Sequence, residues 1–142
     1  MAASGAVTDR DEASGTVVAR GYRGVVVATT ALVLVQAVLA GRGWFVDLGL
    51  IEVHGWVGNA TFLAAIAQAA LAVAGWRGGT LGRAEVALGA LLVALIVAQL
   101  GLGYSGRESA GAASWHIPNG VLIFGVNAAT LALALAGRRR PD

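Results

Sequence analysis

Long apolar runs without charge, separated by short charged segments, dominate this chain and set the expected fold. The uncharged runs are residues 24–41, 53–76, 86–106 and 109–137. About 20 apolar residues are enough to carry a helix across the hydrocarbon core of a bilayer. None of the runs alternates polar with apolar residues as a strand does, and none has the polar face that a helix of a soluble bundle presents to water. The pattern therefore predicts four transmembrane helices.

The expected fold class is all-α membrane, with a four-transmembrane-helix bundle in residues 21–138. The expected spans are about residues 24–42, 53–76, 85–105 and 114–137. Residues 1–20 are small, polar and charged, and we expect them to form a disordered cytoplasmic tail. The composition agrees with a membrane protein, because 57% of the residues are hydrophobic and only 13% are charged, against about a quarter charged in soluble domains.

Positive charge is distributed unevenly between the two ends of the predicted bundle. With four spans, both termini lie on one side, and all of the arginines except Arg42 and Arg107 fall on that side. Cytoplasmic segments of membrane proteins are enriched in basic residues, so we expect both termini in the cytoplasm. The high isoelectric point then reflects this topology and calls for no nucleic-acid partner.

The second and fourth spans share a pattern that begins at a histidine. They read HGWVGNATFLAAIAQAALAVAGWR and HIPNGVLIFGVNAATLALALAGRR. Each has a glycine four residues after the histidine and ends in Ala-x-Ala-Gly before an arginine, and each of the preceding spans carries a glutamine near its outer end. The paired residues are His54 and His116, Gly58 and Gly120, and Gln36 and Gln99. We expect two repeated helical hairpins, related by a pseudo-twofold axis along the membrane normal.

Such an axis places His54 and His116 at one depth on opposite sides of the bundle, where they could share a metal. Zinc needs four ligands, and no cysteine or neighbouring carboxylate completes a set. Haem iron needs only two protein ligands, and the absence of cysteine excludes covalent attachment. Gly58 and Gly120 lie one turn deeper on the same helix faces and would leave room for the macrocycle. The sequence thus predicts one non-covalent haem b; the alternative is a pair of hydrated interfacial histidines.

Four further residues are candidates for the haem site. Arg42 and Arg107, one in each outer loop, could pair with the haem propionates or could serve only to solvate the loops. Gln36 and Gln99 could hydrogen-bond a histidine ring and fix its tautomer, or could join neighbouring helices.

The remaining polar and aromatic residues receive structural interpretations. Pro118 disfavours helical angles at the residue before it, so His116 could sit on an extended lead-in with Ser114 as the N-cap. The residues expected to tie helices together are Gln68, Asn127, Thr29, Thr30, Thr61 and Thr130. The aromatic residues expected at the two membrane boundaries are Trp44, Trp56, Trp115 and Tyr104 outside, and Tyr22 and Trp76 inside.

On these residues the chain resembles one four-helix half of haem A synthase. The matching segments are VHGWVGNATFL, WHIPNGVLIFG and VAQLGLGYSG. That enzyme has two four-helix bundles, with histidines at the outer ends of the second and fourth helices of each. The chain also resembles a family of small four-helix bacterial membrane proteins with the same histidine pair. The resemblance implies His54 and His116 as axial ligands and a multi-pass protein of the bacterial cytoplasmic (inner) membrane, but a single bundle does not imply synthase activity.

The leading functional hypothesis is a membrane b-type cytochrome that transfers electrons or handles haem, with a quinone or a redox protein as partner. Two filled axial positions favour electron transfer over oxygen chemistry. The second hypothesis is a haem-free accessory or structural subunit of a larger complex. The third is a quinone- or superoxide-reactive enzyme, which ranks last because the loops supply no recognisable acid–base set.

Overall fold

The computed structural model describes residues 3–136, with side chains described from Ser14 onward, and all regular structure in these residues is helical. The helices are α1 (Ala3–Phe45), α2 (Gly49–Arg77), α3 (Arg83–Ser105) and α4 (Ala110–Ala136). Each contains a segment long and apolar enough to cross a membrane, which in α1 is Ser14–Phe45. The prediction of a four-helix, multi-pass membrane protein is confirmed.

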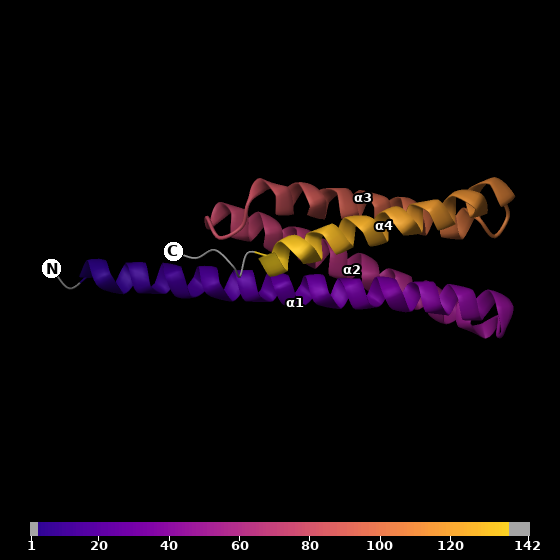
Figure 1. Ribbon diagram of the computed structural model, residues 1–142, viewed down its shortest axis with the longest axis horizontal. Coiled ribbons are helices and arrows are strands. Elements are labelled where there is room, and N and C mark those ends of the chain that lie inside the picture. The colour runs from indigo at the N-terminus through magenta and orange to yellow at the C-terminus, as the bar shows by residue number, and fades with distance from the viewer. Residues whose placement is uncertain (1–2, 137–142) are drawn as a thin grey trace.

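The four helices form an antiparallel bundle in chain order (Figure 1). Helix α1 packs on α2 and α4, and α3 packs on the same two helices, so α1 lies diagonally opposite α3 and α2 lies diagonally opposite α4. Residues 46–48 and 106–109 turn at one end of the bundle, which we call the hairpin end. Residues 78–82 turn at the opposite end. Because successive helices run in opposite directions, corresponding positions of α2 and α4 lie at similar depth.

Helix α1 is longer than the other three. Residues 3–20, which the sequence predicts as part of a disordered tail, are helical in α1. The N-terminal part of α1 projects beyond the other helices (Figure 1), whereas Gly15 already lies against Thr80 in the turn between α2 and α3. The apolar segment of α1 begins only at Ser14. Among the side chains described from Ser14 onward, Tyr22 is the first that is fully buried.

Small residues bring the helices close together, whereas large apolar side chains point outward. A methyl group added to Gly89 of α3 would lie 3.2 Å from the Cα atom of Ala69 in α2, so these two backbones are in near contact. Ala65 and Ala72 are fully buried, while Leu63 and Leu122 are mostly exposed. A bilayer gives no hydrophobic force to bury leucine, and close packing of small residues drives helix association there.

Two apolar clusters fill the bundle interior. The cluster nearer the hairpin end consists of Val33, Ala65, Leu92, Ile96 and Ile123. The cluster nearer the opposite end consists of Tyr22, Val26, Ala72 and Ala134. Between them α4 is joined to α1 by a hydrogen bond of 2.7 Å from Asn127 Nδ2 to Thr30 Oγ1.

Several expected interhelical ties are not formed. Asn127 and Thr30 do join helices, but Thr29, Thr61 and Thr130 donate instead to the carbonyl four residues earlier in their own helix. The Gln68 amide is fully buried, and neither its nitrogen nor its oxygen has a partner among the described residues. Tyr22, which we expected at the inner membrane boundary, is also fully buried.

The expected start of the fourth helix is wrong. Helix α4 begins at Ala110, where the Ser109 hydroxyl accepts a hydrogen bond of 3.3 Å from the Ala112 amide. This is the N-cap bond, whereas the Ser114 hydroxyl donates to the Gly111 carbonyl within the helix. His116 therefore lies inside α4, not on an extended lead-in. The helix passes through Pro118, which has no N–H to donate to the Ser114 carbonyl.

The close approach at Gly89 gives a test of the packing. Gly89→Leu should push α3 away from α2, and overpacking of this kind costs about 1–3 kcal/mol. Thermal unfolding in detergent would measure the loss. The matched control is Gly125→Leu in α4, because Gly125 is exposed and a methyl group there would meet no atom within 4 Å. Equal stability of the two variants would contradict the α2–α3 contact.

Candidate functional site

The two histidines meet inside the hairpin end of the bundle. His54 lies in the second turn of α2, and His116 in the second turn of α4. These helices are diagonally opposite, yet the centres of the two imidazole rings are 6.1 Å apart, with their planes at 63°. Both rings are half-buried. The predicted pairing of His54 with His116 across the bundle is thus present in the geometry.

Gln36 of α1 holds His54 through a pair of reciprocal hydrogen bonds. The Gln36 side-chain nitrogen donates to the His54 carbonyl at 2.8 Å, and His54 Nδ1 lies 3.1 Å from the Gln36 carbonyl oxygen. A carbonyl oxygen can only accept, so Nδ1 must carry the proton in this contact. The neutral imidazole then has a free lone pair on Nε2. We call this pair of bonds the Gln36–His54 tether.

His116 lacks such a tether. Its Nδ1 atom is buried and makes no hydrogen bond of good geometry among the described residues, and the ring has only a weaker contact with the Gln99 backbone. The ring packs closely on α3, where a methyl group added to Gly103 would lie 3.1 Å from His116 Cε1. The corresponding glutamine, Gln99, is engaged elsewhere: its side-chain oxygen accepts a hydrogen bond of 2.7 Å from Asn119 Nδ2.

The predicted glycine gaps are present, but glutamine side chains lie against them. A methyl group on Gly58 would be 3.3 Å from Gln36 Nε2, and one on Gly120 would be 3.2 Å from Gln99 Nε2. Each glycine therefore allows an amide to pack against a helix backbone. A macrocycle could use the same space only if the two glutamine side chains moved aside.

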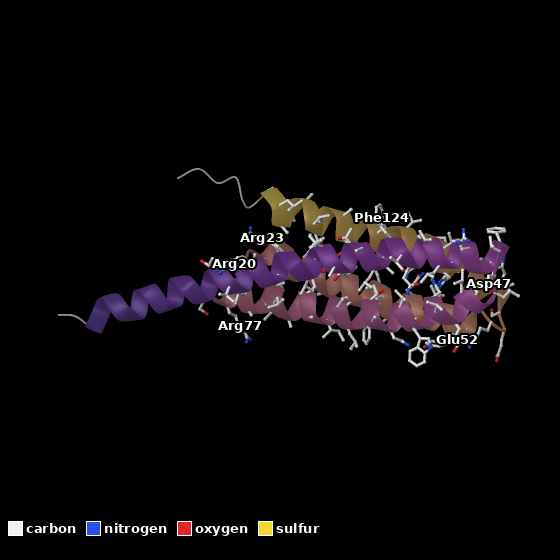
Figure 2. All side chains as sticks on the ribbon, turned by 90° about the horizontal axis from the view of Figure 1, so that it is seen from below. Arg20, Arg23, Asp47, Glu52, Arg77 and Phe124 are labelled. Carbon is white, nitrogen blue, oxygen red and sulfur yellow. The ribbon has the colours of Figure 1, made fainter. Side chains whose placement is uncertain are left out.

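The charged candidates lie at the surface of the hairpin end. Arg42 and Arg107 are exposed, and the Arg107 guanidinium lies 5.6 Å from the centre of the Tyr104 ring. Asp47 accepts a hydrogen bond from the Gly49 amide, which makes it a turn residue before α2. Figure 2 shows Asp47 and Glu52 at this end and Arg20, Arg23 and Arg77 toward the other.

The donor set of the site is two imidazoles. In the part of the chain that the structure describes, no group of three His, Cys, Asp or Glu side chains could hold a metal ion together. The ring centres are 6.1 Å apart and the planes are inclined at 63°. This lies within the range of about 4.5–7 Å for an edge-to-face contact between two rings. A metal held by both rings would need one nitrogen of each imidazole at about 2 Å.

The sequence analysis missed two residues of this site, Asn119 and Gly103. Asn119 lies three residues after His116, on the same face of α4, and it also donates to the Leu95 carbonyl at 2.9 Å. This spacing from His116 could have identified Asn119 as a site residue from the sequence alone. Gly103 had no such signal, because its closeness to His116 depends on how α3 and α4 pack.

Comparisons with known proteins add no family assignment: no protein family, no curated protein and no solved structure matches this chain. The resemblance to one half of haem A synthase stays a prediction that rests on the motifs quoted above.

The hydrogen bonds of Asn119 can be tested by replacement with valine, which stands at the corresponding position of α2 as Val57. Asn119→Val removes two hydrogen bonds to α3, and interhelical hydrogen bonds in membranes each contribute about 0.6–1.7 kcal/mol. Unfolding in detergent should show a loss of this size. Asn59→Val is the control, since Asn59 makes no side-chain hydrogen bond within residues 3–136. Equal effects of the two changes would contradict the role given to Asn119.

Proposed function

We propose that this protein is a membrane b-type cytochrome in which His54 and His116 hold one non-covalent haem b near the extracytoplasmic face, for electron transfer or haem handling. The observation that carries the proposal is the 6.1 Å separation of the two ring centres across the bundle. Two imidazoles at this spacing, without a third ligand among the described residues, suit a cofactor that brings its own equatorial ligands.

The tautomer of His54 supports a role as axial ligand. A metal-binding histidine commonly donates its other ring N–H to a carbonyl or carboxylate, which orients the ring and strengthens the ligand. The contact of His54 Nδ1 with the Gln36 carbonyl is of this kind and leaves Nε2 available. Bound haem would supply one-electron chemistry, while the chain would fix the ligand orientation and keep the site within an apolar bundle.

The proposal includes the duplication of the helical hairpin. Contacts that recur in the two halves support it. Gly58 meets Gln36 in the first hairpin as Gly120 meets Gln99 in the second, and the glycine near the end of each first helix packs on the first turn of the helix that follows. The pairs in this second contact are Gly43 with Ile51, and Gly106 with Ala113. Independent hairpins would have no reason to repeat both contacts.

The proposed orientation puts both termini in the cytoplasm of a bacterial cell. Its support is the charge distribution along the bundle, with Arg20, Arg23 and Arg77 gathered away from the hairpin end (Figure 2). The haem would then lie near the outer face of the cytoplasmic membrane. Since one haem at that depth cannot carry an electron across the bilayer alone, a quinone or a redox protein is the expected partner.

One observation favours a second candidate, a haem-free accessory subunit. The Gln36 and Gln99 amides lie against Gly58 and Gly120, in the space that the haem edge would need. In that case the histidines would form an edge-to-face pair that helps α2 and α4 to pack. The two candidates differ in one measurable property, which is the colour of the purified protein.

Absorption spectra decide between them. Purified in detergent, the protein should contain about one haem per chain and show a sharp α-band after dithionite reduction, as expected for two histidine ligands. His54→Ala and His116→Ala should each abolish the low-spin band, because each removes one of the two ligands. If the spectra of both alanine variants matched that of the wild type, or if the purified wild type were colourless, the cytochrome would be excluded.

The orientation can be tested by cysteine labelling, since the chain has no cysteine of its own. Ser105→Cys, at the hairpin end, should react in intact cells with a thiol reagent that does not cross membranes. Ala84→Cys, at the start of α3, should react only after the cells are opened, because the proposed orientation puts it on the cytoplasmic side. If Ala84→Cys reacted in intact cells and Ser105→Cys reacted only in opened cells, the orientation would be inverted, with the termini outside and the histidine pair near the cytoplasm.

A further inference from the structure

The two histidines are held unequally, although the proposed duplication would make them equivalent. The His54 ring donates to one carbonyl, and its own carbonyl accepts from the same glutamine. His116 Nδ1 makes no hydrogen bond of good geometry among residues 3–136, and the ring has only a weaker contact with the Gln99 backbone. Rotation of the His54 ring therefore breaks a hydrogen bond of 3.1 Å, whereas rotation of the His116 ring gives up only this weaker contact.

The glutamine partners explain the difference. Gln36 is free to donate to the His54 carbonyl, and Val57 in the following turn offers it no hydrogen bond. At the corresponding position of α4, Asn119 donates to both the Gln99 side chain and the Leu95 carbonyl. This bond joins the Gln99 side chain to the turn below the histidine, and no hydrogen bond from Gln99 to the His116 carbonyl corresponds to the one that Gln36 donates to the His54 carbonyl.

The backbone around His116 is also less constrained. Pro118 cannot donate to the Ser114 carbonyl, so one helical hydrogen bond that would span His116 is missing. The first turns of α2 contain no proline. A helix that lacks a backbone hydrogen bond in this way kinks or bends more easily at that turn.

From this asymmetry we infer that His54 is the fixed ligand of the pair and His116 the exchangeable one, so that the site accepts a small neutral ligand on its His116 side. The inference rests on the proposed haem. If haem were bound, His116 would be the residue released, keeping its electron pair, and the incoming molecule would take its place by donating its own pair, with no electron transfer. Carbon monoxide, added to the reduced protein, is the probe.

The decisive measurement compares haem retention in the two alanine variants. His116→Ala should keep its haem through purification and bind carbon monoxide faster than the wild type. His54→Ala should retain at most about one tenth of the haem that His116→Ala retains, because the partners that orient a ligand contribute about 10–100-fold to metal affinity. Equal retention in both variants, or better retention in His54→Ala, would overturn the assignment while leaving the cytochrome intact. A colourless wild type would overturn the proposed function, and this inference with it.

A second measurement tests the unequal tethering without haem. The full chain, purified from haem-deprived cells, is treated with diethyl pyrocarbonate, and acylation of each histidine is followed by mass spectrometry. His116 should react faster than His54. Gln36→Met removes the side-chain bond to the His54 backbone carbonyl but keeps the backbone carbonyl that the ring contacts, so His54 should still react more slowly than His116. Equal rates for the two histidines in the wild type, or a faster reaction at His54, would contradict the unequal tethering.

Discussion

In a bilayer the backbone must satisfy its own hydrogen bonds, and this constraint governs the whole protein. It is the reason that four apolar runs become four helices and not strands or loops. It also sets how the helices meet, because a hydrocarbon solvent does not drive leucine into the interior. Packing of glycine and alanine, as between Gly89 and Ala69, then provides the close contact between helices. A polar side chain inside the bundle is stabilised only where another residue can form a hydrogen bond with it.

The histidine end shows how such partners are built. An imidazole within the apolar bundle would be unfavourable alone. Gln36 meets this requirement for His54 with two hydrogen bonds that join α1 to α2. Near His116 the Gln99 side chain bonds to Asn119, and the ring has only a weaker contact with the Gln99 backbone. The same fold therefore surrounds two similar residues with different degrees of constraint.

Much of this arrangement could be predicted from sequence, because the signals are local. The uncharged runs gave the four helices, and the shared His-x-x-x-Gly spacing gave the pairing of His54 with His116. The start of α4 could not be predicted in the same way. Pro118 suggested an extended segment, but the Ser109 cap and the packing of α4 on α3 keep the helix continuous through it. Tertiary contacts outweigh the local preference of the residue before proline.

The sequence also could not show that the buried Gln68 amide has no hydrogen-bond partner among the described residues. Gln68 looked like an interhelical tie, because an amide in a transmembrane span usually finds one. Whether it does depends on which atoms face it from α1 and α3, and no spacing in the sequence reports that. The same holds for Gly103, whose importance comes only from the ring of His116 beside it.

Gln68 has a consequence for the energy of the bundle as a whole. Its amide can form as many as four hydrogen bonds, yet neither polar atom has a protein partner within residues 3–136. A buried amide without partners is unfavourable in an apolar interior, so Gln68 is a local exception to the match between sequence and environment. A hydrogen bond between α1 and α4 lies in the same part of the bundle, from Asn127 to Thr30. The packing of the bundle therefore carries the cost of the Gln68 amide.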